Sequence, residues 1–375
     1  MIIFFFIYCT VKINIVVAQM TTNNLPTNIL VAPLNWGLGH ATRCILIIRE
    51  LEKNGFVPII ASDGASLLML KKEFPHLTAL ELPSYCIKYP KNYQFFKWKL
   101  LINSPKLVKA ILSEKKIVKQ WITDYSLKGI ISDNRFGVYN KTIPSVYITH
   151  QLKVMSGNTT KITSKIHSYF IKKFNECWVP DVKGTPNLSG ELGHLSKTDL
   201  TIKYIGILSR MKKEVVPIRY ELMVLLSGPE PQRTILEEKL TKKLPNYTDR
   251  VVFIKGKVEA EQKIEQIGNI TFYNYMQTKE LEETFNASEM VLSRSGYTTV
   301  MDLTKLEKKA YFIPTPGQYE QEYLASKYKF DGWIASSKQY KFRFEHLGAM
   351  HLYNGLPKIN SKTNWKELFN IFQSE

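Results

Sequence analysis

The chain has 375 residues, about twice the length of a typical single domain, so two domains are expected. Hydrophobic residues make up 44% of the chain and charged residues 22%, and this balance excludes a largely disordered protein. Lys and Arg number 51 against 33 Asp and Glu, a net charge of +18. A basic chain favours an anionic partner, and nucleic acid, an anionic membrane surface and a phosphorylated small molecule all qualify.

Residues 1–27 form an apolar N-terminal extension that admits three interpretations. It lacks the basic start of a signal peptide, and Lys12 interrupts the run that a membrane-spanning helix needs. The alternatives are a misplaced start upstream of Met20, a membrane anchor and a secretory signal. The cysteines are scattered without a CxxC pair, which predicts neither disulfides nor a zinc site and fits a cytoplasmic setting; they are Cys9, Cys44, Cys86 and Cys177.

From residue 28 the chain alternates between apolar runs and helical patterns. Residues 29–34 and 56–61 predict strands that flank a helix, which makes one βαβ unit. Further strands are expected at 128–132, 145–149, 176–179, 202–207, 222–226, 251–254, 270–272, 290–292 and 310–313. This pattern predicts an α/β fold of two doubly wound, Rossmann-like domains that face each other across a cleft. We expect domains at 28–210 and 218–335, a linker at 211–217, and terminal helices at 336–375.

Three glycine-containing loops follow predicted strands and precede predicted helices. They are residues 37–40 (GLGH), 227–229 (SGP) and 293–296 (SRSG). Glycine lets a backbone approach a ligand closely, and a helix N-terminus offers unpaired N–H groups to an anion. One such loop is often a plain tight turn, but three at equivalent points favour a phosphate-bearing ligand.

The order of motifs in the second half resembles family 28 glycosyltransferases, which include the UDP-N-acetylglucosamine transferase of peptidoglycan lipid-intermediate synthesis. The motifs are FYNYM, ASEMVLSRSGYTTVMDL and PTPGQYEQEYLA, between residues 272 and 325, and the GxGH loop extends the resemblance into the first half. The resemblance implies a GT-B fold with an N-terminal acceptor domain and a C-terminal donor domain. It also implies inverting transfer of a hexose-type sugar from a UDP-sugar to an acceptor hydroxyl, with a lipid-linked acceptor.

Carried over position by position, the resemblance implies a donor site in the second half. Residues 274–276 would touch uracil through main-chain atoms, the SRSG loop would lie against the diphosphate, and Asp302 would hold the ribose. The family usually has Glu at that position, and Glu322 departs from a glutamine pair at the donor sugar. The implied donor residues are Ser227, Gly228, Tyr275, Met276, Arg294, Ser295, Gly296, Asp302, Gln321 and Glu322.

His40 is the candidate catalytic base, because a neutral imidazole accepts a hydroxyl proton near neutral pH. It closes the acceptor loop of Gly37 and Gly39. Asp133 follows a predicted strand and resembles the acid that orients the histidine of plant UDP-glycosyltransferases, which implies that it orients His40. His150 is a weaker alternative base. Arg294 or Arg233 would stabilise the leaving diphosphate. The sequence contains no DxD pair, so we expect a metal-independent enzyme without a cofactor besides its UDP-sugar.

Residues 85–121 carry nine lysines and a single acid, Glu114, interleaved with aromatic residues. This composition suits peripheral contact with the inner face of a membrane, or a phosphorylated lipid acceptor. It would also suit single-stranded nucleic acid, which the resemblance makes a weaker expectation. Two other interpretations of the whole chain stay open: a UDP-sugar 2-epimerase on the same fold, and a non-enzymatic basic binding protein.

Overall fold

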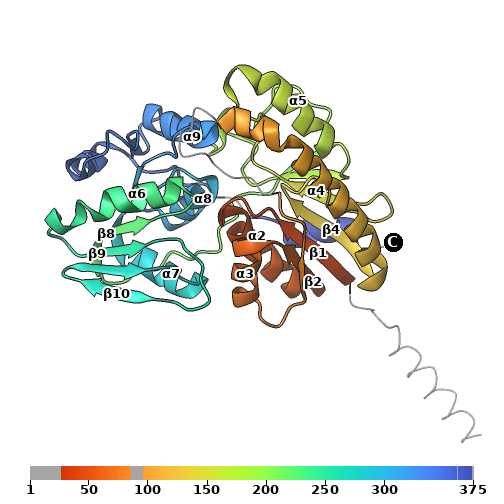
Figure 1. Ribbon diagram of the computed structural model, residues 1–375, viewed down its shortest axis with the longest axis horizontal. Coiled ribbons are helices and arrows are strands. Elements are labelled where there is room, and N and C mark those ends of the chain that lie inside the picture. The colour runs from red at the N-terminus through yellow and green to blue at the C-terminus, as the bar shows by residue number, and fades with distance from the viewer. Residues whose placement is uncertain (1–26, 86–95, 361, 374–375) are drawn as a thin grey trace, which may run out of the picture.

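The computed structural model describes residues 27–85, 96–360 and 362–373, with the backbone alone described over 96–104. The interpretations of residues 1–26 and of residues 86–95 therefore lie outside the described part of the chain. The described residues form two seven-stranded sheets, each flanked by helices (Figure 1). Within them no helix is both long enough and apolar enough to cross a membrane.

The first sheet has the strand order β3-β2-β1-β4-β5-β6-β7, and all of its strands are parallel. Its strands are β1 (Thr27–Pro33), β2 (Phe56–Ser62), β3 (Ala79–Glu81), β4 (Leu127–Asp133), β5 (Ser145–Ile148), β6 (Glu176–Val179) and β7 (Ile202–Tyr204). The helices are α2 (Gly39–Lys53), α3 (Gly64–Glu73), α4 (Phe96–Asp124) and α5 (Thr160–Ile171). The central strands are apolar on both faces because helices cover both sides of a parallel sheet.

The second sheet has the order β10-β11-β9-β8-β12-β13-β14 and is parallel except for the β10–β11 hairpin. Its strands are β8 (Tyr220–Leu225), β9 (Val251–Ile254), β10 (Ile264–Ile267), β11 (Ile270–Tyr273), β12 (Ser288–Ser293), β13 (Lys309–Phe312) and β14 (Ala335–Ser336). The helices are α6 (Gln232–Thr241), α7 (Thr278–Asn286), α8 (Tyr297–Leu306), α9 (Tyr319–Phe330) and α10 (Trp365–Phe369). A 3₁₀ helix covers Phe344–Leu352.

Strand register brings the candidate residues to one edge of each sheet. In the first sheet Pro33 pairs with Asp133, and Asp133 pairs with Ile148, so β1, β4 and β5 end side by side. In the second sheet Ser293, the last residue of β12, pairs with Leu225 of β8. The carboxyl ends of parallel strands are where doubly wound folds bind ligands.

The chain returns to the first domain at its C-terminus. The rings of Phe369 and Phe372 lie against Phe56, with ring centroids 5.6 and 6.4 Å away, and both also contact Trp178. One apolar cluster runs from the first sheet through Leu208 and Met211 of the connecting segment into the second domain. The two domains therefore share a continuous core.

Candidate functional site

The predicted catalytic pair of His40 and Asp133 is brought together. His40 is the second residue of α2 and Asp133 ends β4, and their Nδ1 and Oδ1 atoms lie 2.8 Å apart. Asp133 is fully buried, whereas the side chain of His40 retains 15% of its exposure. If Nδ1–H donates to Asp133, the Nε2 atom of His40 carries the free lone pair that a general base needs.

Arg43 and Cys44 also contact the carboxylate of Asp133. The Arg43 guanidinium donates to both carboxylate oxygens, with Nε 2.5 Å from Oδ2, and Cys44 Sγ lies 3.6 Å from Oδ2. Burial opposes ionisation, but Arg43 and His40 outweigh it and hold the pKa of Asp133 well below its usual value. Asp133 is therefore a fixed anion that receives hydrogen bonds from α2.

The environment of His40 keeps its imidazole neutral. Burial lowers the pKa of His40; Asp133 raises it, and Arg43 beside the ring lowers it again, with a net result below the usual 6.5. Arg43 Nη2 lies only 2.8 Å from Nδ1. Arg43 can only donate, so it competes with Asp133 for Nδ1; when Nδ1–H is donated to Asp133, the neutral ring can accept a proton on Nε2.

The alternative base, His150, lies between two charged side chains. Its Nδ1 lies 3.1 Å from Arg43 Nη1, and its Nε2 lies 2.8 Å from Glu320 Oε1. Both ring nitrogens are thus engaged, and the role of His150 as an alternative base stays a prediction. Sequence patterns did not single out Arg43 or Glu320, since contacts across 107 and 170 residues leave no local signal.

The glycine loops of the two domains face each other. Gly37 has φ +81° and Gly228 has φ +104°, and a Cβ on Gly37 would lie 3.8 Å from the Cα of Gly228. Thr298, in the first turn of α8, donates from Oγ1 to the carbonyl oxygen of Gly39 at 2.9 Å. The N-termini of α2 and α8 therefore meet at the domain interface (Figure 1).

The two arginines expected near the diphosphate, Arg294 and Arg233, form hydrogen bonds and ion pairs within the second domain. Arg294 is 1% exposed, and its guanidinium donates to the carbonyl oxygens of Ile313, Pro314 and Gln232. Arg233 is 3% exposed and pairs with Glu230 and Glu237. These contacts stabilise the second domain and leave each guanidinium few donors, while a role of either arginine at the diphosphate stays a prediction.

The rest of the SRSG loop contacts the predicted sugar-binding residue Gln321. Ser295 donates from Oγ to the carbonyl oxygen of Gln321 at 2.8 Å, and a Cβ on Gly296 would lie 3.9 Å from Gln321 Nε2. Gln321 Oε1 accepts a hydrogen bond from the backbone N–H of Thr315 at 2.9 Å. Ser295, Gly296 and Gln321 thus form one local unit at the start of α8.

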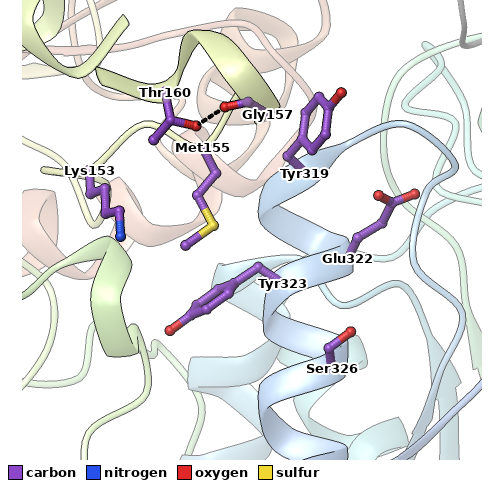
Figure 2. A pocket seen from close by; sticks show the side chains of 8 residues that line it. All are labelled: Lys153, Met155, Gly157, Thr160, Tyr319, Glu322, Tyr323 and Ser326. Carbon is purple, nitrogen blue, oxygen red and sulfur yellow. Dashed lines mark hydrogen bonds between the residues drawn. The ribbon is translucent and has the colours of Figure 1, made fainter. Parts of the chain in front are cut away.

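Glu322, the next residue after Gln321, has different contacts from those of Ser295, Gly296 and Gln321. Its Oε1 accepts a hydrogen bond from the backbone N–H of Gly317, and its side chain lines a separate cavity of about 460 Å³. Figure 2 shows this cavity between α9 and the segment that leads into α5, lined by Lys153, Met155, Gly157, Thr160, Tyr319, Glu322, Tyr323 and Ser326. The carboxylate that contacts His150 is Glu320, and the role of Glu322 at the donor sugar stays a prediction.

In the segment expected to contact uracil, residues 274–276, backbone polar groups form hydrogen bonds with other protein groups. The N–H of Tyr275 donates to Asn274 Oδ1, and its carbonyl oxygen accepts from Gln262 Nε2, both at 3.0 Å. The Asn274 carbonyl oxygen accepts from Lys257. The main-chain contacts of Tyr275 and of the buried Met276 with a base stay predictions.

Asp302 lies on α8 against the segment that joins the domains. It is 7% exposed, and Ser209 donates to its Oδ1 at 2.6 Å. Burial raises the pKa of Asp302 to about 6, although Arg210 and Ser209 act in the opposite direction. Arg210 is also 7% exposed, and its Nε has no hydrogen-bond partner among the described residues. A buried, incompletely paired guanidinium favours an anionic ligand, and sequence patterns missed it.

Comparisons with known proteins identify similar sequences and folds. Residues 232–331 match the model of the glycosyltransferase family 28 C-terminal domain. The "UDP-N-acetylglucosamine--N-acetylmuramyl-(pentapeptide) pyrophosphoryl-undecaprenol N-acetylglucosamine transferase" of Clostridium botulinum (strain Langeland) is 23% identical over 74% of this chain and 75% of that protein. The Haemophilus influenzae (strain PittGG) protein of the same name is 26% identical over 62% and 64%.

The second half of the chain is similar to family 28 glycosyltransferases.

Solved structures show the same fold. The glycotransferase of kitacinnamycin has a TM-score of 0.57 at 14% identity and covers 92% of this chain and 94% of its own. Arabidopsis thaliana UGT89C1, complexed with UDP-L-rhamnose, has a TM-score of 0.57 at 12% identity, with 89% and 91% covered. The predicted GT-B fold of two Rossmann-like domains is therefore confirmed.

The described part of the basic segment lies on α4 and has an apolar neighbour in α5. Phe136 packs with Leu107 and Ile111 of α4 and also contacts Phe170 of α5, with ring centroids 4.7 Å apart. Both helices leave apolar side chains exposed; they are Val108, Leu112, Ile162, Ile166 and Tyr169. We call these five residues the α4–α5 apolar stripe.

Proposed function

We propose that this protein is a glycosyltransferase that transfers a hexose-type sugar from a UDP-sugar to an acceptor hydroxyl, with inversion at the anomeric carbon and without a metal ion. The observation that carries the proposal is the His40–Asp133 pair, positioned where the glycine loops of the two domains meet. Inversion requires one direct displacement, with a base on the acceptor side and stabilising groups on the diphosphate side.

In this reaction the acceptor oxygen loses its proton to His40 Nε2 as it bonds to the anomeric carbon. The bond from that carbon to the diphosphate oxygen breaks, and its electron pair leaves with UDP. His40 becomes an imidazolium whose positive charge Asp133 stabilises, since the two groups are 2.8 Å apart. Asp133 stays ionised throughout because Arg43 keeps its pKa low.

The N-terminus of α8 stabilises the negative charge that develops on the leaving diphosphate. This helix begins at Tyr297 with Gly296 as its N-cap, and the first N–H groups of a helix lack intrahelical partners. Arg210, near Asp302, takes the supporting cationic role that sequence analysis had given to Arg294. Asp302 accepts hydrogen bonds from the ribose hydroxyls after releasing Ser209.

The proposed acceptor is lipid-linked, and the proposed localisation is peripheral, at the cytoplasmic face of a membrane. The names of the bacterial relatives describe a pyrophosphoryl-undecaprenol acceptor. The α4–α5 apolar stripe and the exposed lysines among the described side chains of α4 support a surface that rests on anionic lipid.

A transfer assay tests the proposal. The purified protein would be incubated with UDP-[¹⁴C]N-acetylglucosamine, an extract of polyprenyl diphosphate-linked lipids and EDTA. We expect label in the organic phase and stoichiometric release of UDP, both abolished in His40→Gln. Conversion of the sugar nucleotide without an acceptor would instead indicate the 2-epimerase.

A further inference from the structure

Three side chains outside the assigned pair join it to the second domain. Arg43 lies between Asp133 and His150, and His150 lies between Arg43 and Glu320. Glu320 is the second residue of α9, in the donor domain, whereas the other four residues belong to the first domain. The result is one chain of polar contacts from the donor domain to His40.

Hydrogen-bond chemistry fixes the direction of this chain. Arg43 has only donors, so His150 Nδ1 must accept from Arg43 Nη1. The proton of a neutral His150 is then on Nε2 and is donated to Glu320 Oε1 at 2.8 Å. The other oxygen of Glu320 accepts from the side-chain amide of Gln151. Arg43 Nη2 contacts both Asp133 Oδ1 and His40 Nδ1, so Arg43 and Asp133 compete for this nitrogen of His40.

A second contact holds the His150 ring from the donor domain. Tyr297, the first residue of α8, stacks on His150 with ring centroids 4.2 Å apart and an interplanar angle of 2°. Tyr297 also donates from its hydroxyl to the carbonyl oxygen of Pro180 in the first domain at 2.9 Å. Tyr297 adjoins Gly296 and Glu320 adjoins Gln321, so both residues that grip His150 are next to proposed donor contacts.

We propose that Glu320, His150 and Arg43 are positioning residues that orient the His40–Asp133 pair when the donor domain closes on the acceptor domain. Glu320 and Tyr297 fix the His150 ring, His150 fixes one arm of the Arg43 guanidinium, and the other atoms of that guanidinium grip Asp133. Asp133 then holds the His40 ring in the Nδ1–H tautomer with Nε2 free. This inference rests on the proposed function for its catalytic meaning, but the linkage itself requires no ligand.

The test compares Glu320→Ala and Glu320→Gln with Glu322→Ala, which removes a carboxylate two residues along the same helix that faces the separate cavity. Amide hydrogen exchange of residues 148–151 without ligand and long-range ¹H–¹⁵N spectra of labelled histidines are recorded for each. His40 is assigned with His40→Gln, and melting temperatures verify folding. The spectra distinguish the two tautomers of each ring.

We expect Glu320→Ala to accelerate exchange at 148–151 by about threefold or more and to reduce the Nδ1–H population of His40. Glu320→Gln keeps an acceptor for His150, so its exchange rate and its Nδ1–H population of His40 should lie between those of Glu320→Ala and the wild type. In Glu322→Ala both quantities should match the wild type. Wild-type exchange and an unchanged His40 tautomer in Glu320→Ala would overturn the proposal.

A parallel UDP titration distinguishes a failure of the positioning proposal from a failure of the proposed function. UDP affinity within about twofold of the wild type in Glu320→Ala, together with a turnover about tenfold lower, assigns the effect to positioning rather than to donor binding. If UDP fails to bind the wild type, the proposed function fails, whereas the exchange and tautomer results still decide the linkage.

Discussion

At the scale of single residues, His40 carries the largest predicted effect. His40→Ala should lower kcat by about 10²- to 10⁴-fold, because a positioned general base contributes that much, and should leave the Kd for UDP unchanged. Since burial and Arg43 hold the pKa of His40 below 6.5, kcat/KM should be level at neutral pH and fall under acidic conditions. The control is His76→Ala, whose side chain is 60% exposed on the surface. Equal turnover in His40→Ala and the wild type would refute the assignment.

Asp302 predicts a pH dependence of donor binding. Its pKa is raised to about 6 by burial, so it gains a charge as the pH rises through 6, and an anion accepts ribose hydrogen bonds more strongly than a carboxylic acid. UDP affinity should therefore increase from pH 5 to pH 7 in the wild type and stay flat in Asp302→Asn, as measured by calorimetry. Parallel curves for the two proteins would contradict this role.

The raised pKa of Asp302 also determines how the stability of the folded protein changes with pH. The folded pKa of Asp302 lies above its unfolded value of 3.8, so protonation favours the folded state, and this contribution is lost as the pH rises through about 6. Asp302→Asn keeps the side chain neutral, and its stability relative to the wild type should therefore be higher at pH 7 than at pH 5.

At the scale of elements, Arg294 anchors the loop between β12 and α8. Arg294→Ala leaves the carbonyl oxygens of Ile313, Pro314 and Gln232 without this donor in a buried site, and should lower the free energy of unfolding by about 2–4 kcal/mol. Urea denaturation measures this value. A stability loss below about 0.5 kcal/mol combined with lost UDP affinity would favour the direct diphosphate role.

The α4–α5 apolar stripe predicts lipid binding that depends on particular side chains. Ile162→Glu with Ile166→Glu places two charges on the exposed face of α5 and should weaken sedimentation with phosphatidylglycerol vesicles by about tenfold. Leu352→Glu is the control, because Leu352 is 72% exposed outside these helices. Unchanged sedimentation of the double variant would exclude the stripe as a membrane contact.

Element types and glycine loops were predictable because they depend on local pattern. Alternating apolar runs identified the buried strands, and the GLGH and SRSG loops lie directly before helices as expected. The pair of His40 and Asp133 was predictable from parallel topology, which brings strand ends together. The partners Arg43, Glu320 and Arg210 were not, since their side chains also suit ordinary surface positions and only the tertiary fold brings them to the site.

At the scale of the whole molecule, the C-terminus fastens the second half of the chain to the first. A Cβ on Gly129 would lie 2.3 Å from Cδ1 of Phe372, so this ring fills space that glycine leaves on β4. Phe372→Ala should lower the free energy of unfolding by about 3–5 kcal/mol. Urea denaturation followed by tryptophan fluorescence measures this loss, and Phe330→Ala, at a 92% exposed position, is the matched control. Equal stability of the two variants would show that this contact is dispensable.

The domain interface connects these scales. The second domain contacts the first through Thr298 and Glu320, next to the predicted donor residues, so the proposed donor site and the proposed base share one interface. A binding protein without catalysis would have no need for a buried His–Asp pair at the meeting point of three glycine loops. The central claim is therefore that a UDP-sugar binds in the second domain beside that pair.

Calorimetric titration of the purified protein with UDP in EDTA, with ADP and GDP as controls, tests this claim most directly. We expect micromolar binding of UDP alone, weakened by about tenfold or more in Asp302→Ala, since a lost ribose contact to a carboxylate costs at least about 1.4 kcal/mol. Absence of binding by UDP in the wild type, with or without metal, would contradict the account.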